Sequence, residues 1–108
     1  MKDQRGPAIR ALAESARERR YWRYEHTEPD EGAGLWYFEC VRDGEEWWCI
    51  RQIAPDPDGV SGYDWAYLED ERGFLTDQPI DPDEAQLQAI SASEFEAAWR
   101  DAVQQRAP

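Results

Sequence analysis

The stretch that decides the fold comprises residues 35–53, which read LWYFECVRDGEEWWCIRQI. Two runs of aromatic and β-branched residues flank a polar turn with Asp43-Gly44 at its centre. Such runs around an Asp-Gly pair are typical of a β-hairpin. The sequence therefore predicts two antiparallel strands, residues 35–41 and 46–53, joined by a tight turn.

The register of this hairpin determines which side chains share a face of the sheet. With Asp43 and Gly44 as the central turn residues, Val41 lies opposite Glu46, and alternate side chains point the same way. One face, which we expect to be the core, carries Trp36, Phe38, Cys40, Trp47, Cys49 and Ile53 and is interrupted by Arg51. The other face is a mixed aromatic and polar surface that carries Leu35, Tyr37, Glu39, Val41, Trp48, Ile50 and Gln52.

Shorter runs with a period of two flank the hairpin. Residues 21–26 predict the first strand of the sheet, and residues 63–69 predict the fourth. The segments between the strands, residues 27–34 and 54–62, contain proline and glycine and are expected to be loops. Residues 76–84 contain two prolines and are expected to cross the surface irregularly.

The C-terminal segment has the pattern of a well-specified helix. Ser91 is the expected N-cap, with Glu94 three residues later as the partner of a capping box. Ile90 and Phe95 flank this cap in the spacing of a hydrophobic staple. The apolar stripe of the helix consists of Phe95, Ala98, Trp99, Ala102 and Val103. We expect this stripe to cover the first, aromatic face of the sheet.

These elements predict an α+β fold, in which an antiparallel sheet of about four strands carries the C-terminal helix on one face. Residues 7–20 predict an additional N-terminal helix or a tail. A chain of 108 residues has room for a single domain. We divide it into an N-terminal helical extension, residues 1–20, and a single acidic α+β domain, residues 21–108.

The net charge of -12 is unevenly distributed. Residues 1–23 hold seven basic and three acidic side chains, whereas residues 24–108 hold five basic and 21 acidic ones. A body of this charge repels phosphate groups, so direct binding to nucleic acid is not expected. It attracts a basic protein partner and accelerates the encounter with it. The alternative is that the acidity serves only solubility.

The compartment predicted from the sequence is the cytoplasm. No apolar run approaches the roughly 20 residues of a membrane span, and the N-terminus lacks the apolar centre of a signal peptide. Two cysteines in 108 residues also suit a reducing compartment, because small secreted domains carry denser disulfide frameworks.

No local pattern indicates catalysis, and we expect neither a cofactor nor a metal site. The single histidine, His26, lies at the end of a predicted strand and is expected to have a structural role. Cys and His residues do not occur at metal-ligand spacing, and no glycine-rich phosphate loop is present. We therefore do not expect an enzyme.

Two weaker alternatives involve chemistry. Asp56, Asp58 and Asp64 belong to one glycine-containing loop, which suits the oxygen preference of calcium but not the EF-hand spacing. Cys40 and Cys49 share a face with a diagonal offset in the predicted register, which does not favour a disulfide. We expect both cysteines to be small core residues, with a redox switch as the minor alternative.

The candidate partner-binding residues are acidic side chains of loops and turns, together with aromatic and acidic residues of the second sheet face. They are Glu28, Asp30, Glu31, Tyr37, Glu39, Glu45, Glu46, Trp48, Asp56, Asp58 and Asp64. Aromatic anchors with a rim of carboxylates suit insertion into a basic cleft. The alternative is that the N-terminal helix covers Tyr37 and Trp48.

Four short motifs follow one another along the chain: Trp22-x-x-Glu25-His26, Tyr37-Phe38-Glu39, Arg51-Gln52-Ile53 and Ile90-Ser91-x-x-Glu94-Phe95-Glu96-x-x-Trp99. In this order they resemble a small bacterial domain family of unknown function, found near polymorphic-toxin loci and suspected to consist of immunity proteins. The resemblance covers residues 21–103 and implies no catalytic residues.

We therefore expect a non-catalytic acidic protein that inhibits a cationic toxin domain, for example a nuclease. Its carboxylates would occupy the positions of the phosphate groups. The alternative is a nucleic-acid mimic or regulatory module that binds a basic host protein. A third hypothesis, an enzyme with dispersed acidic catalytic residues, would require a deep pocket with a carboxyl group of raised pKa.

Overall fold

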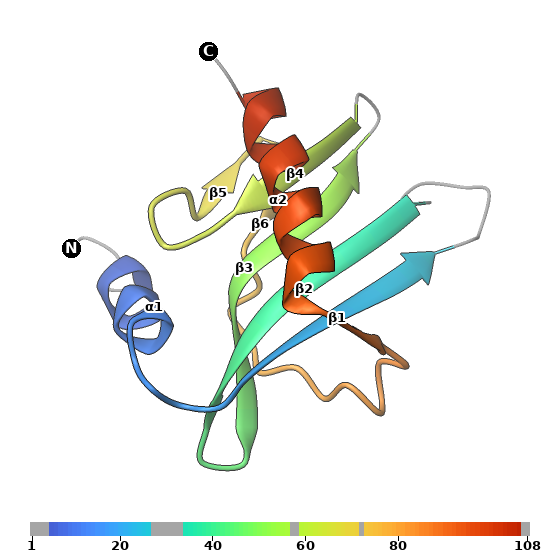
Figure 1. The fold of residues 1–108 in the computed structure, drawn as a ribbon. Helices are drawn as coiled ribbons and strands as arrows, with labels where there is room; N and C mark the ends of the chain where they lie inside the picture. The colour runs from blue at the N-terminus through green and yellow to red at the C-terminus, as the bar shows by residue number, and fades with distance from the viewer. Residues whose placement is uncertain (1–4, 27–33, 57–58, 72, 107–108) are drawn as a thin grey trace.

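The structure, a computed structural model, describes residues 5–26, 34–56, 59–71 and 73–106. The elements along the chain are α1 (Arg5–Ala13), β1 (Arg19–His26), β2 (Gly34–Asp43), β3 (Glu46–Asp56), β4 (Gly59–Tyr63), β5 (Glu69–Asp70), β6 (Gly73–Phe74), β7 (Gln88–Ile90) and α2 (Ala92–Arg106). Five strands form an antiparallel sheet in the order β4-β3-β2-β1-β7, and β5 pairs with β6. Helix α2 crosses one face of this sheet (Figure 1). The predicted α+β fold is confirmed.

The turn of the central hairpin lies one residue later than predicted. Asp43 pairs with Glu46, so that Gly44 and Glu45 are the central residues of the turn. Gly44 has a φ of 68°, which glycine adopts at little steric cost at the first central position of a two-residue hairpin turn. The predicted register is therefore wrong by two residues, and Cys40 lies directly opposite Cys49.

A β-bulge changes the faces of the second half of β3. Cys40 pairs with Cys49, but the next pair along β2 is Glu39 with Arg51, so that Ile50 is an extra residue in β3. Because side chains alternate along a strand, this extra residue moves Arg51 and Ile53 to the opposite face from the one predicted. Ile53 therefore shares a face with Tyr37, and this is the face that α2 covers. The predicted register places Gln52, a polar residue, on that face.

The sheet has an apolar cluster on each face. The cluster under α2 contains Tyr21, Tyr37, Ile53, Val60, Ile90, Phe95, Ala98, Trp99 and Ala102. The cluster on the opposite face includes Trp22, Trp36, Phe38, Cys40, Trp47, Cys49, Ala54, Tyr63, Leu75, Ile80 and Leu87. The prediction that α2 covers the Trp36 and Phe38 face is therefore wrong. The irregular segment between β6 and β7 supplies its own apolar residues and covers that face instead.

The edges of the sheet also differ from the prediction. The strand beside β3 is β4, most of which lies in the predicted loop 54–62. It ends at Tyr63, where the predicted fourth strand begins. A tight turn follows, in which the main chains of Asp64 and Tyr67 exchange hydrogen bonds of 3.2 Å. The Asp64 side chain accepts from the Ala66 amide at 2.9 Å, so polar turn chemistry overrides the aromatic alternation of 63–69.

The start of α2 confirms the predicted N-cap. The Ser91 Oγ atom accepts a hydrogen bond of 3.1 Å from the Glu94 amide, and Ile90 and Phe95 belong to the same apolar cluster. Among the described residues, no helix is long and apolar enough to cross a membrane.

Helix α1 lies against the sheet as a short appendage (Figure 1) and ends at Ala13. Ile9 packs against the cluster on the face opposite α2, and the buried Gly6 permits close approach of the helix to the chain around Trp65. A Cβ atom at Gly6 would lie 2.9 Å from the Trp65 carbonyl oxygen. The predicted N-terminal helix is therefore present and packed, but it is shorter than the predicted residues 7–20, and β1 already begins at Arg19.

The close approach of α2 to β4 depends on Gly62. A Cβ atom there would lie 3.0 Å from the Trp99 ring and 3.3 Å from the Ala102 Cβ atom. We expect Gly62→Val to lower the free energy of unfolding by about 2 kcal/mol in urea denaturation, because the added side chain overpacks this contact. Ala97→Val, on the exposed face of α2, is the control and is expected to change it by about 0.5 kcal/mol or less. Equal effects of the two substitutions would contradict this packing.

Candidate functional site

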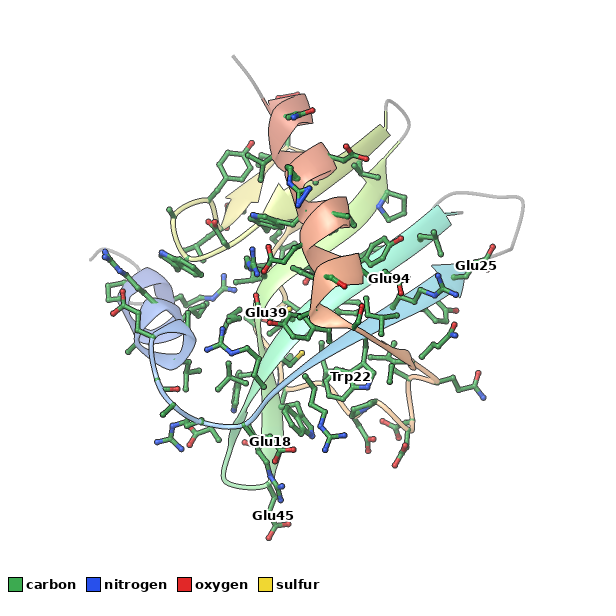
Figure 2. All side chains as sticks on the ribbon, viewed as in Figure 1. Glu18, Trp22, Glu25, Glu39, Glu45 and Glu94 are labelled. Atoms are coloured by element: carbon green, nitrogen blue, oxygen red, sulfur yellow. The ribbon has the colours of Figure 1, made fainter. Side chains whose placement is uncertain are left out.

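A groove of about 610 Å³ lies beside the β2–β3 turn, on the sheet face opposite α2. Strands β1, β2 and β3 and the segment after β6 contribute to it. Its lining residues are Glu18, Arg20, Trp22, Arg42, Glu45, Glu46, Trp47, Pro79, Ile80, Asp81, Pro82 and Asp83. Figure 2 shows Glu18 and Glu45 at the turn end of the hairpin, with Trp22 farther along the sheet. We call this surface the acidic groove.

The floor of the acidic groove is aromatic. Trp22 and Trp47 share this face of the sheet and contact each other edge to face, with ring centroids 5.2 Å apart and planes at 86°. The guanidinium group of Arg20 lies 5.9 Å from the centre of the Trp47 ring. The Trp47 ring is thus already placed where it attracts a cation.

Carboxylates outnumber guanidinium groups in the acidic groove by five to two. Both arginines are held by a single carboxylate, since Glu18 lies 2.9 Å from the Arg20 Nη2 atom and 3.2 Å from the Arg42 Nη1 atom. Hydrogen bonds from Arg20 and then Arg42 lower the pKa of Glu18. Within the described part of the chain, Glu45, Glu46 and Asp83 form no ion pair, so their charge is available to a partner.

The second wall of the groove is held by the hydrogen bonds of residues 79–83. The Ile80 amide donates to the Trp47 carbonyl oxygen at 2.8 Å, which attaches the segment to β3. The Asp81 carboxylate accepts from the amides of Asp83 and Glu84 at 3.1 and 3.2 Å. Asp81 therefore stabilises the local turn, while Asp83 remains exposed at the rim.

Of the predicted partner-binding residues, Glu45 and Glu46 line the acidic groove. Tyr37 is half-buried in the cluster under α2, and Trp48 is half-buried beside Leu12 in a cavity that α1 lines. Tyr37 is therefore covered by α2 and not by the N-terminal helix, whereas α1 and Trp48 both line one cavity. Asp64 belongs to the turn after β4, apart from the groove.

The remaining acidic candidates lie where the structure gives no side-chain description. Glu28, Asp30, Glu31 and Asp58 are outside the described residues. Asp56 ends β3, and its side chain is also outside the description. Their proposed part in partner binding, and the calcium alternative for Asp56, Asp58 and Asp64, remain predictions. Among the described residues, no group of three His, Cys, Asp or Glu side chains is placed to hold a metal ion.

Glu39 corrects the prediction of an exposed acidic residue, because its exposure is 1%. The carboxylate accepts hydrogen bonds from the Arg19 Nη1 atom at 2.9 Å, from the Tyr21 hydroxyl at 3.2 Å and from the Arg51 Nε atom. Burial and then the Glu39 charge raise the pKa of Tyr21. Glu39 therefore does not present its charge to a partner.

Arg51 connects Glu39 to α2. Its guanidinium group donates to the Glu96 carboxylate at 2.5 and 3.2 Å and lies 5.0 and 5.1 Å from the ring centres of Phe95 and Trp99. Hydrogen bonds from Arg51 lower the pKa of Glu96. The predicted candidate Glu39 is thus part of a network, with its own carboxylate buried, that attaches the helix to the sheet.

The two cysteines are buried, opposite each other and not joined by a disulfide. Burial raises the pKa of the Cys49 thiol well above its ordinary value. A thiol of raised pKa is a poor nucleophile, so this environment favours the predicted role of Cys49 as a small core residue.

The tryptophans and arginines of the acidic groove were not among the predicted site residues. The sequence pattern predicts Trp22 and Trp47 to be core residues. No pattern of neighbouring residues indicates that they lie close to residues 79–83. The only signal was the acidic, proline-bounded sequence Pro79-Ile-Asp-Pro-Asp83, because prolines hold such a segment out of regular structure and at the surface.

No family model matches the chain, and neither a curated protein nor a solved structure shows significant similarity to it. The resemblance to suspected immunity proteins therefore stays a prediction.

We expect the loss of an ion pair to destabilise the fold more in the buried network than at the exposed surface. Arg51→Met is expected to lower the free energy of unfolding by about 3 kcal/mol, because it leaves the buried Glu39 charge with less compensation. The double variant Glu39→Leu, Arg51→Met is expected to regain part of this loss, since it removes both charges. Urea denaturation measures both values.

Arg10→Met is the matched control, because Arg10 and Glu14 form an ion pair with side chains 64% and 65% exposed. We expect little change in stability, as is usual for an exposed pair. Equal effects of Arg10→Met and Arg51→Met would contradict a structural role for the buried network.

The lowered pKa of Glu96 predicts a pH-dependent effect of Glu96→Gln. A pKa that is lower in the folded state means that ionised Glu96 stabilises the fold above its ordinary pKa of 4.5. This contribution is lost as the pH falls through the lowered value. The stability difference between the wild type and Glu96→Gln should therefore be largest near neutral pH and shrink below pH 4.5. In an Arg51→Met background the pH dependence of the difference should diminish, and an unchanged dependence would contradict the assignment to Arg51.

Proposed function

We propose that the chain is a non-catalytic acidic binding protein that inhibits a cationic protein, in the manner of an immunity protein or antitoxin. The observation that carries this proposal is the acidic groove, with five carboxylates, two guanidinium groups and an aromatic floor. Both guanidinium groups share the single carboxylate of Glu18, so the five carboxylates leave the groove with a net charge of -3. Within the described part of the chain, Glu45, Glu46 and Asp83 form no ion pair.

A lysine or arginine of the partner fits this arrangement chemically. Its cationic group would lie between Glu45 and Asp83, with its aliphatic stem against Trp47. Charge-assisted hydrogen bonds to the two carboxylates favour such a group over a neutral one. The surrounding negative charge speeds the encounter and disfavours acidic partners. Insertion of this surface into a basic active site would block the positions that phosphate groups occupy in a nuclease.

A cytoplasmic location forms part of the proposal. It is supported by two unbridged cysteines, which suit a reducing compartment.

A second candidate function is a nucleic-acid mimic that binds basic host proteins. The observation that favours it is that exposed carboxylates are not confined to the groove. Glu69, Glu71, Asp77, Glu84 and Asp101 are exposed and do not line the groove. Binding that depends on the whole negative surface would be less specific and more sensitive to salt than binding through one groove.

The test is affinity capture from the native organism with the full chain, compared with two variants. Glu45→Lys, Glu46→Lys and Asp83→Lys together reverse the charge of the groove, and Asp101→Lys on the exposed face of α2 is the control. We expect one stoichiometric basic protein that the wild type and the control retain at high salt. The triple variant should lose this protein, and co-expression of the wild type should relieve the growth inhibition that the partner causes.

Each outcome separates the candidates. Retention of the partner by the triple variant would show that the groove is not the binding surface. Several basic proteins released together as the salt concentration rises would favour the mimic. A retained partner that does not inhibit growth would contradict the inhibitor function.

A further inference from the structure

A second groove, of about 500 Å³, lies beside the acidic groove and differs from it in chemistry. Its floor includes Trp36 and Phe38, whose rings are nearly parallel at 14° with centroids 6.4 Å apart. Ala54, Leu87 and Phe74 add apolar surface around them. Phe74 is 55% exposed, and it is the large hydrophobic side chain left exposed within the described part of the chain. We call this surface the apolar groove.

The two polar side chains in the apolar groove, Gln52 and Thr76, are already engaged, and the Thr76 hydroxyl oxygen accepts from the Gln78 amide at 3.5 Å. The Gln52 Nε2 atom donates to the Phe74 carbonyl oxygen at 3.0 Å, and its Oε1 atom accepts from the Thr76 amide at 2.9 Å. A small-molecule site usually offers a few convergent polar groups that orient the ligand. Because the Gln52 amide is used at both ends, the groove suits an apolar side chain better than a small polar ligand.

Ile80 lines both grooves, so the two grooves are adjacent and share a wall at this residue. The Ile80 amide is bonded to the Trp47 carbonyl oxygen, which fixes the shared wall against β3. A partner that places a cation in one groove therefore has a neighbouring part of its surface over the other. One partner can therefore occupy both grooves at the same time.

We propose that the apolar groove binds an aromatic or aliphatic side chain of the same protein partner whose basic side chain enters the acidic groove. The recognised feature is then a short extended segment that carries one apolar and one basic residue at a fixed spacing. This inference rests on the proposed function, and it names the chemistry of the partner. Apolar anchors that enter a pocket beside charged contacts are the usual centre of a protein interface.

Charge distinguishes this occupant from others that an apolar surface could attract. A second copy of the chain would bring another set of groove carboxylates close to the first, and like charges at an interface oppose association. An anionic membrane surface would be repelled by the same carboxylates. A basic protein segment is the occupant for which the charge of the adjoining groove is favourable.

The test is selection of binders from a displayed library of short linear random peptides, with the full chain as the immobilised target. We expect the selected peptides to share a lysine or arginine and an aromatic or aliphatic residue at one spacing. Peptides synthesised from the selected sequences then serve as probes in calorimetry. Phe74→Asp and Ala85→Asp each place a carboxylate in the apolar groove and should weaken peptide binding at least about tenfold.

The matched control is Ala97→Asp, which adds the same charge on the exposed face of α2 and should leave peptide binding unchanged. Ala85 is exposed, so its replacement tests the groove even if Phe74→Asp perturbs the pairing of β5 with β6. Matching urea denaturation curves for the variants and the wild type verify that each one is folded.

Three results would overturn this inference in distinguishable ways. Selected peptides that are only basic, and that bind Phe74→Asp and Ala85→Asp as tightly as the wild type, would show that the apolar groove does not bind the partner. The proposed role of the acidic groove would be unaffected. Selected peptides that lack basic residues, and that bind the Glu45→Lys, Glu46→Lys, Asp83→Lys variant unchanged, would contradict the proposed function as well. Failure to select any peptide would contradict recognition of a linear segment.

Discussion

The arrangement of the domain depends on how one buried carboxylate is satisfied. Glu39 lies on the central strand β2 with 1% exposure, where an unpaired charge would cost several kcal/mol. Arg19, Tyr21 and Arg51 all donate to it, and Arg51 also binds Glu96 of α2. Arg19 additionally donates to the Ala13 carbonyl oxygen at the end of α1, at 2.7 Å. The network therefore joins both helices to three strands.

Because α2 covers one face of the sheet, grooves that could bind a partner form on the opposite face. With one face covered by a regular helix, the opposite face is left to the segment between β6 and β7. This segment has polar and proline residues as well as Leu75, which is fully buried, so it covers the sheet incompletely. The acidic groove and the apolar groove lie where this incomplete cover meets the strands, with Ile80 between them. This face of the sheet therefore carries one groove rich in carboxylates and one apolar groove.

The features predictable from the sequence are those specified by neighbouring residues. The Asp-Gly hairpin, the α2 N-cap at Ser91 and the apolar stripe through Phe95 each rest on side chains within a few positions of one another. The extra residue Ile50 is different, because no local pattern distinguishes a bulge from regular alternation. One such residue moves Arg51 to the helix-covered face, where it donates a hydrogen bond to the buried Glu39.

The acidic groove was only half predictable for the same reason. Glu45 and Glu46 belong to a turn, and turns are polar and exposed, so their place at the surface follows from the sequence. Their proximity to Asp83 depends on the hydrogen bond that attaches Ile80 to β3, a contact between residues 33 positions apart in the sequence. Strand β7 was missed because three residues are too short to show a period of two.

The proposed function requires that the acidic groove, rather than the negative charge of the whole surface, recognises a cationic side chain. An NMR titration of the ¹⁵N-labelled full chain with N-acetyl-arginine amide, followed through the backbone amides and the tryptophan indole groups, tests this directly. We expect saturable shifts centred on Glu45, Asp83 and the Trp47 indole. Shifts of similar size at Glu69 and Asp101, or shifts that do not saturate, would contradict it.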